Sequence, residues 1–398
     1  MNTFFCRAFQ CCFAVGARFL PWRTPEVFSG EGSLLRAADI LRENGLRRPF
    51  VIASRRQCAD EHFRALQEKL DEQDILLSIF SSVEPNPSVE TVEKIAAQYK
   101  IDSCDCFLVI GGGSPMDAAK AAAACLARPD KPLSQLVGLL KVRRRIPSLI
   151  AVPTTAGTGS ETTIAAVVTD GRHKYSISDL CLIPRYAILD PTLSAGLPPH
   201  ITAETGMDAL THAVEAYLSR FYNTGETRAL AESAVVTIFS HLERAYRDGA
   251  SLPDRAAMLQ ASFDAGAAFT RASVGNVHAI AHTLGGLYGV PHGLANAVLL
   301  PIVLEDYGPK AYPRLARLAS LAGLAGETEE AHARAFIAEI LAMNARMGIP
   351  DHFDCIRDED IPLMARWAAQ EANPVYPVPV IYDEPRFARV IERSRHAR

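Results

Sequence analysis

Several features that mark particular protein classes are missing from this sequence of 398 residues. It has 41 basic against 45 acidic residues, a formal net charge of −4, so it lacks the basic surface that binds nucleic acid. It has no apolar run of about 18 residues, which excludes a transmembrane helix. It also lacks internal repeats and low-complexity tracts. The remaining composition, 48% hydrophobic and 22% charged, is typical of a globular protein with two or three domains.

Cysteine is too sparse and too irregularly placed to form a disulfide framework. The chain has nine cysteines, an odd number, and most lie inside apolar runs such as 106–110. This pattern favours a reducing, cytoplasmic environment. Cys104 and Cys106 are two residues apart, and no second pair is present to complete a zinc site. We therefore interpret them as thiols at the edge of a strand.

Residues 1–24 are apolar and rich in cysteine, but Arg7, Gln10 and Arg18 interrupt the run. The segment lacks the basic start and the small-residue cleavage site of a signal peptide. We predict an amphipathic helix that packs on the body of the protein or on a partner. A helix lying on a membrane surface is the alternative.

The rest of the chain divides into two parts with different hydrophobic patterns. In residues 25–196, short β-branched runs alternate with helical stretches, which predicts βαβ units and a parallel, Rossmann-like sheet. In residues 197–398 the strands stop, and the pattern predicts an all-helical domain. The predicted strands span 48–54, 106–110 and 148–152. The predicted helices span 61–70, 115–126, 203–220, 226–247, 254–271, 274–287, 311–323 and 328–347.

A glycine-rich turn follows the strand at 106–110. Gly111, Gly112 and Gly113 let backbone N–H groups approach an anion closely. We expect Ser114 to cap the next helix and Pro115 to occupy its first position, where a helix start attracts pyrophosphate. The third glycine of the dinucleotide fingerprint and the lysine of a P-loop are both missing. A plain glycine turn therefore remains open.

A second loop, residues 153–161, follows the strand at 148–152 and is crowded with hydroxyl groups. It contains Thr154, Thr155, Thr158 and Ser160. Ligands bind at the carboxyl ends of strands in open α/β sheets, and hydroxyls suit a ribose, a phosphate or a carboxamide. An ordinary capped turn explains the glycines of this loop but not its density of hydroxyls.

The helical half contains spaced residues that suit a metal ion. Asp208 and His212 are four apart on one predicted helix, and His278 and His282 are four apart on another, so each pair shares a helix face. His292 follows in a Gly/Pro-rich loop that is able to fold back. A carboxylate with imidazoles is a suitable set for a divalent cation, and buried histidines need partners. A purely structural role for these five residues is the alternative.

Together the segments 111–117, 153–161, 190–191, 206–212 and 278–292 resemble the iron-containing, or group III, alcohol dehydrogenases. The resemblance extends from about Pro25 to the C-terminal region. It implies the dehydroquinate synthase-like architecture, an α/β domain followed by an all-helical domain, and a homodimer.

The resemblance also implies the site residues. Asp208, His212, His278 and His292 would bind the metal, with Fe²⁺ as the family expectation and Zn²⁺ as the ion that such ligands bind more tightly. His282 would lie beside the nicotinamide and the substrate as a proton relay. The implied cofactor contacts are Asn86, Gly112, Gly113, Ser114, Asp117, Thr154, Thr155, Thr158, Thr163, Lys174, Leu193 and Gly196.

One departure from the family pattern bears on the cofactor. Family members often end the strand matching 50–54 with an aspartate that binds the adenosine ribose, whereas this chain has Ser54 followed by Arg55 and Arg56. Guanidinium groups suit a 2′-phosphate, so Ser54 and Arg55 favour NADP(H) over NAD(H). The alternative is that the arginines lie on a solvated loop. Ala165 stands where some members have an aromatic residue, which leaves the pocket shape open.

The sequence thus predicts a metal-dependent, NAD(P)-linked dehydrogenase for small primary alcohols or aldehydes. Two alternatives share the architecture: a zinc polyol dehydrogenase and a metal-free reductase of the maleylacetate type, although four intact candidate ligands disfavour the second. A non-catalytic nucleotide-binding relative would bind cofactor without oxidising any alcohol. A metallohydrolase would use the same ligands without a nicotinamide, and the two nucleotide-like loops disfavour it.

Overall fold

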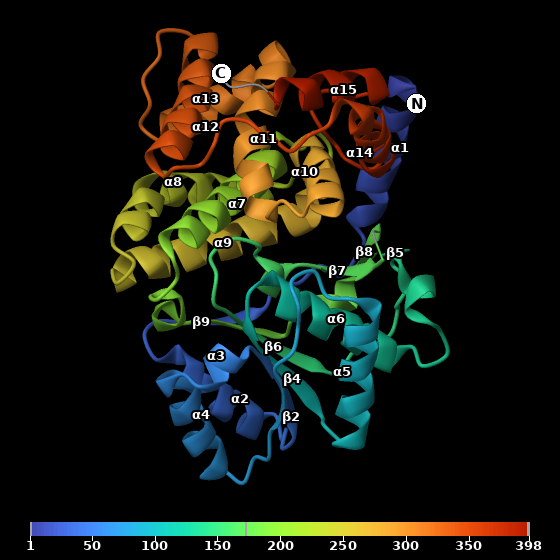
Figure 1. Cartoon of the computed structure of the whole chain (residues 1–398), viewed down its shortest axis with the longest axis vertical. Coiled ribbons are helices and arrows are strands. Elements are labelled where there is room, and N and C mark those ends of the chain that lie inside the picture. The colour runs from blue at the N-terminus through green and yellow to red at the C-terminus, as the bar shows by residue number, and fades with distance from the viewer. Residues whose placement is uncertain (1, 172, 396–398) are drawn as a thin grey trace. The chain divides into compact units, whose positions relative to one another are not determined.

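The computed structural model describes residues 2–171 and 173–395, without the side chains of His173 and Lys174. These residues form two compact units. One spans Pro21–Gly196, and the other joins the residues up to Leu20 with those from Leu197 onward. Figure 1 shows the strands in the first unit and bundled helices in the second. A search of the described residues finds no helix both long and apolar enough to cross a membrane.

The first unit is built on a six-stranded sheet in which every neighbouring pair is parallel. The strand order is β1-β9-β6-β4-β2-β3, and a three-stranded sheet, β5-β8-β7, lies apart from it. The strands of the large sheet are β1 (Glu26–Ser29), β2 (Pro49–Ala53), β3 (Ser78–Phe80), β4 (Cys106–Gly111), β6 (Ser148–Pro153) and β9 (Tyr186–Leu189). The small sheet contains β5 (Gly138–Leu139), β7 (Ala165–Asp170) and β8 (His173–Ser178).

Helices cover both faces of the large sheet, as an all-parallel sheet requires. Alternate residues of β2 and β4 belong to different cores: Phe50 and Phe107 belong to one, and Val51 and Leu108 to the other. The helices of this unit are α2 (Arg36–Glu43), α3 (Arg55–Cys58), α4 (Glu61–Asp71), α5 (Val89–Ile101) and α6 (Gly113–Ala127). The predicted parallel α/β fold is confirmed.

The second unit is helical, as predicted. Its helices are α1 (Thr3–Ala17), α7 (Pro199–Leu218), α8 (Gly225–Arg247), α9 (Leu252–Ala272), α10 (Asn276–Tyr288), α11 (His292–Tyr307), α12 (Tyr312–Leu321), α13 (Glu329–Arg346), α14 (Ile361–Ala372) and α15 (Glu384–Arg393). Helix α7 is buried over most of its length. It packs against α8 so closely that a Cβ on Gly206 would lie 2.2 Å from Leu242 Cδ1.

Three details of the predicted elements are wrong. Helix α6 begins at Gly113, so Gly112 is the N-cap, and Ser114 and Pro115 lie within the first turn. Glycine at both positions permits this earlier start. His292 is the first residue of α11 rather than part of a loop. That helix is buried nearly all round, so its sequence has no polar face and lacks the amphipathic period that reveals a helix.

Candidate active site

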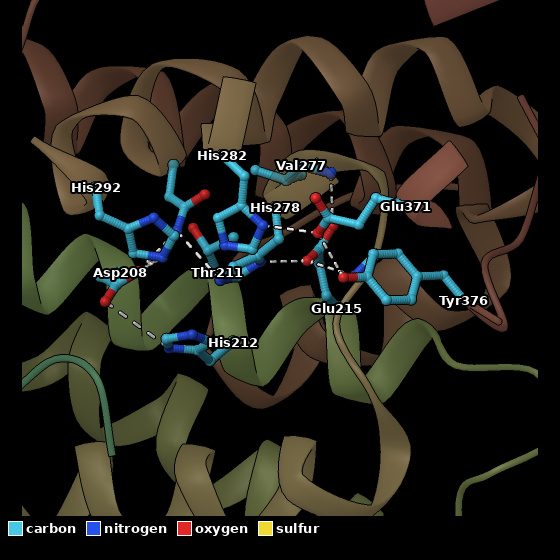
Figure 2. A network of polar contacts seen from close by, with 12 residues as sticks. Asp208, Thr211, His212, Glu215, Val277, His278, His282, His292, Glu371 and Tyr376 are labelled. Carbon is cyan, nitrogen blue, oxygen red and sulfur yellow. Dashed lines mark hydrogen bonds and ion pairs between the residues drawn. The ribbon is translucent and has the colours of Figure 1, made fainter. Parts of the chain in front are cut away.

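Four side chains converge in the helical unit. Asp208 and His212 come from α7, His278 from α10 and His292 from the start of α11, and Figure 2 shows them turned toward one another. Each offers one ligand atom, and these atoms all lie within 4.8 Å of one another. Asp208 Oδ1 is 3.6 Å from His292 Nε2, and Asp208 Oδ2 is 4.0 Å from His212 Nδ1. The i, i+4 spacing on α7 and the return of the chain through α10 and α11 produce this cluster.

The donor set fits a divalent metal ion. It offers one carboxylate and three imidazoles, ligands that Fe²⁺ and Zn²⁺ both accept. Burial and the neighbouring histidines lower the pKa of His278 well below its ordinary value, so its imidazole is neutral, as a ligand must be. His212 stacks between Phe269 and His278, with ring centroids 4.2 and 4.6 Å away, which holds its ring in place.

Glu215 orients one of these histidines, and the sequence analysis missed it. Its Oε2 lies 2.6 Å from His278 Nδ1, which leaves His278 Nε2 for the cluster. The same carboxylate accepts hydrogen bonds from the N–H groups of Gly275 and Val277. Burial raises the pKa of Glu215 to about 8, although these N–H groups lower it. Carboxylate–histidine pairs of this kind are typical behind metal ligands. Its spacing of seven residues from Asp208 on α7 was a usable signal.

Asn296 on α11 is a second residue that the sequence analysis missed. Its Nδ2 donates to Asp208 Oδ1 at 2.7 Å and lies 3.1–3.2 Å from the Nε2 atoms of His292 and His278. Its Oδ1 is buried and has no hydrogen-bond partner among the described residues. The amide thus touches three of the four candidate ligands. Its position four residues after His292 was the only sequence signal.

His282 lies beside the cluster but outside the four-residue set. Its ring stacks on His292 with centroids 5.3 Å apart, and its Nδ1 lies 2.6 Å from Glu371 Oε1. The hydroxyl of Tyr376 donates to that same Oε1 at 2.7 Å (Figure 2). A polar chain therefore runs from Tyr376 through Glu371 to His282. Glu371 and Tyr376 lie far from His282 in the sequence, and no motif indicated them.

In the α/β unit, the two predicted loops lie side by side. Strands β4 and β6 are neighbours that pair Gly111 with Pro153, and the N–H of Thr154 donates to Gly111 O at 3.1 Å. A Cβ on Gly112 would lie 3.1 Å from Thr155 Oγ1, and one on Gly113 would lie 3.0 Å from Thr158 Cγ2. Glycine is therefore needed where the loops approach.

The start of α6 is suited to an anion. No side chain caps it, so its first N–H groups keep their capacity to bind one. Three other predicted cofactor residues are close by. Ser114 Oγ accepts a hydrogen bond from the N–H of Asn86 at 3.3 Å, and Asp117 Oδ1 accepts one from Ser160 Oγ at 3.2 Å. The structure thus places Asn86, the glycine turn and the hydroxyl loop together.

At the end of β2, Ser54 caps the short helix α3 by accepting a hydrogen bond from the N–H of Gln57. The side-chain amide of Gln57, which the sequence analysis did not single out, donates to Thr154 Oγ1 at 3.1 Å. Arg55 and Arg56 are exposed. A Cβ on Gly196 would lie 3.8 Å from an Arg56 nitrogen, so Arg56 reaches the end of this unit.

A buried lysine on α6 holds the hydroxyl loop through hydrogen bonds. Lys120 on α6 is fully buried, and its Nζ contacts both the carbonyl and the hydroxyl of Ser160 and of Thr163, and the carbonyl of Ala165. Thr163 is itself 3% exposed, and its hydroxyl accepts a hydrogen bond from Lys120. Of the remaining predicted cofactor residues, Leu193 packs against one core of the sheet. The side chain of Lys174 lies outside the described residues.

Comparison with known proteins identifies the family. Residues 24–191 match the family model of iron-containing alcohol dehydrogenase, and residues 202–382 match the C-terminal model of the Fe-containing alcohol dehydrogenase family. The chain is 41% identical to 1,3-propanediol dehydrogenase of Klebsiella pneumoniae over 76% of its own length and 80% of that protein.

Solved structures agree with this match. A crystal structure of 1,3-propanediol oxidoreductase superposes with a TM-score of 0.90 at 34% identity, covering 95% of this chain and all of the other. Sulfoacetaldehyde reductase from Bifidobacterium kashiwanohense, in complex with NAD⁺, superposes with a TM-score of 0.82 at 27% identity over 94% and 98% of the two chains. From its motifs, its fold and these matches, this chain belongs to the iron-containing alcohol dehydrogenase family.

Proposed function

We propose that this protein is a metal-dependent, NAD(P)-linked dehydrogenase that interconverts small primary alcohols and aldehydes. The observation that carries the proposal is the set of one carboxylate and three imidazoles whose ligand atoms lie within 4.8 Å of one another in a member of this family. The names of its relatives, which act on 1,3-propanediol and on sulfoacetaldehyde, support a short substrate.

Each unit contributes one part of the machinery. In the helical unit, Asp208, His212, His278 and His292 would hold the metal ion. In the α/β unit, the start of α6 at Gly113 would hold the phosphates of the cofactor through its backbone N–H groups. When bound, the metal supplies positive charge that polarises the substrate oxygen, and the nicotinamide accepts or supplies the hydride.

The chain's own residues would manage orientation and the proton. Glu215 fixes the ring of His278, so that Nε2 faces the metal position. Glu371 accepts from Nδ1 of His282, which sets the tautomer and leaves Nε2 of His282 to take the proton that an alcohol hydroxyl releases. In the reverse direction, the same nitrogen returns the proton to the product.

We also propose that NADP(H) is preferred. Ser54 ends β2 where an acidic residue would repel a 2′-phosphate, and the exposed Arg55 and Arg56 follow it. Iron is the expected native metal from the family, with zinc able to occupy the same ligands. The family resemblance extends the proposal to a homodimer and the cysteine pattern extends it to a cytoplasmic location, which light scattering and cell fractionation would test.

The decisive experiment follows absorbance at 340 nm with NAD⁺ and NADP⁺, using 1-propanol and propanal as substrates. Protein stripped with chelator is compared with protein reloaded with Fe²⁺ or Zn²⁺. His278→Ala should lose both stoichiometric metal and turnover. The control is His352→Ala, because this histidine pairs with Asp351 and Asp354 at the surface. Full turnover of His278→Ala in metal-free buffer would refute the proposal, and a higher kcat/KM with NAD⁺ would refute the cofactor preference.

A further inference from the structure

The N-terminal helix α1 precedes the residues that match the family, which begin at residue 24. One face of α1 is buried against the helical unit and includes Cys6 and Gln10, both 0% exposed. The opposite face leaves Phe4 and Phe5 exposed at 79% and 54%. A glutamine that is completely buried on a largely apolar helix needs hydrogen-bond partners, and these partners show what α1 does.

The partners of Gln10 are backbone carbonyls of one irregular segment, residues 373–380, which we call the strap. Gln10 Nε2 donates to Pro374 O at 2.9 Å and to Tyr376 O at 2.7 Å. Arg7, one turn before, donates to Pro379 O at 3.0 Å and to the side-chain oxygen of Gln10 at 2.9 Å. Helix α1 thus satisfies three carbonyls of the strap through two side chains.

The strap depends on such donors because of its composition. It contains prolines at 374, 377 and 379, which have no N–H and prevent it from pairing as a strand or continuing α14. Other carbonyls of the strap accept hydrogen bonds from elsewhere in the unit. The hydroxyl of Tyr222 donates to Val375 O, and the side-chain amide of Asn276 donates to Val380 O. Helix α1 also supports Tyr222, because Phe13 packs on its ring at 5.1 Å.

The strap carries one residue of the polar chain that ends at His282. Tyr376, whose carbonyl Gln10 holds, donates its hydroxyl to Glu371 Oε1 at 2.7 Å. That oxygen is also 2.6 Å from His282 Nδ1 (Figure 2). Burial and the Glu371 carboxylate raise the pKa of Tyr376 well above its ordinary value, so the hydroxyl remains a donor. The contacts with Tyr376 and with His282 together orient the carboxylate of Glu371 toward His282.

We infer that α1 is a clamp on the active site: Gln10 and Arg7 hold the strap, the strap holds Tyr376, and Tyr376 holds Glu371 in position for His282. Gln10 and Tyr376 are then positioning residues for the alcohol dehydrogenase reaction. This inference rests on the proposed function for its kinetic consequence only. The clamping of the strap is a physical property that stands without it.

The first test measures the strap directly, by amide hydrogen exchange of peptides covering 372–382. Gln10→Met keeps the length of the side chain and removes both donors, and Val15→Met on the exposed face of the same helix is the matched control. We expect exchange in these peptides to be about tenfold faster in Gln10→Met and unchanged in Val15→Met. Unchanged exchange in Gln10→Met would overturn the clamp. If Gln10→Met fails to fold, Arg7→Met, which removes the donors to Pro379 O and to the side chain of Gln10, gives the same reading.

The second test measures turnover. Gln10→Met should lower kcat about tenfold with the KM for cofactor unchanged, because a misplaced proton-transfer group slows the chemical step without weakening cofactor binding. Tyr376→Phe should lower kcat similarly. In the double variant the two effects should not multiply, since both act through Glu371. Multiplying effects, or an unchanged kcat in Gln10→Met, would overturn the positioning role. A wild-type protein that oxidises no alcohol would instead refute the proposed function, and the exchange experiment would still decide the clamp.

Discussion

Lys120 offers a sharp test of how the α/β unit holds the hydroxyl loop. Its ammonium group lies 2.5–3.1 Å from the backbone carbonyls of Ser160, Thr163 and Ala165. One buried cation therefore ties α6 to the segment that includes the hydroxyl loop. Replacing Lys120 with methionine keeps most of its volume and removes every donor.

The size of the effect follows from two opposing terms. The loss of three hydrogen bonds from a charged donor to backbone carbonyls costs roughly 1.5–3 kcal/mol each, about 6 kcal/mol together. Burial lowers the pKa of Lys120 from 10.5 to about 8, which is a penalty of about 3 kcal/mol that the variant does not bear. The net loss is then about 3 kcal/mol. For a unit of this size it lowers Tm by roughly 6–12 °C.

Differential scanning calorimetry measures the fall in Tm, and fluorescence titration with NADPH measures the effect on the loop. We expect the Kd for NADPH to rise about tenfold, because Ser160, whose N–H donates to Thr158 Oγ1, loses its contacts with Lys120. Lys94→Met is the control, since Lys94 is exposed on α5 of the same unit. An unchanged Tm would refute the role of Lys120 in stability. A lower Tm with an unchanged Kd would refute the link between Lys120 and cofactor binding at the hydroxyl loop.

Three further predictions concern single side chains. Burial raises the pKa of Glu161 from 4.5 to about 7, so its contribution to the free energy of unfolding is complete below pH 4.5 and lost as pH rises through about 7. The free energy of unfolding in urea should fall by about 3 kcal/mol between pH 5 and pH 8 in wild type and should not fall in Glu161→Gln. The same pH dependence in both proteins would contradict this prediction. Gly113→Val should weaken NADPH binding at least about tenfold with metal content intact, because its Cβ would lie 3.0 Å from Thr158 Cγ2. An unchanged Kd in fluorescence titration would show that the glycine turn and the hydroxyl loop have room for a side chain. Asn296→Leu removes the donor to Asp208 and should weaken metal binding about 10–100-fold in a chelator competition, so equal affinities would exclude a supporting role for the amide.

Local sequence determined the elements and the chemistry that each one carries. Alternating β-branched runs predict the parallel sheet because buried strands and covering helices leave different patterns. The pairs Asp208/His212 and His278/His282 could be assigned to helix faces because spacing of four residues is a property of one helix. The glycine turn and the hydroxyl loop could be placed at strand ends because each directly follows a predicted strand in the sequence. Helix α11 escaped because a helix buried on all sides has no amphipathic pattern.

Only the tertiary structure decided which distant residues serve these elements. Periodicity assigns polar residues to the solvent side, yet Gln10 and Lys120 are both completely buried. They are buried because each donates to backbone carbonyls of a distant segment, Gln10 to the strap and Lys120 to Ser160, Thr163 and Ala165. Glu371 is likewise found only by proximity, since the need of a histidine for an oriented partner sets no distance along the chain. The sequence therefore determined the reacting groups, and packing decided how they are held.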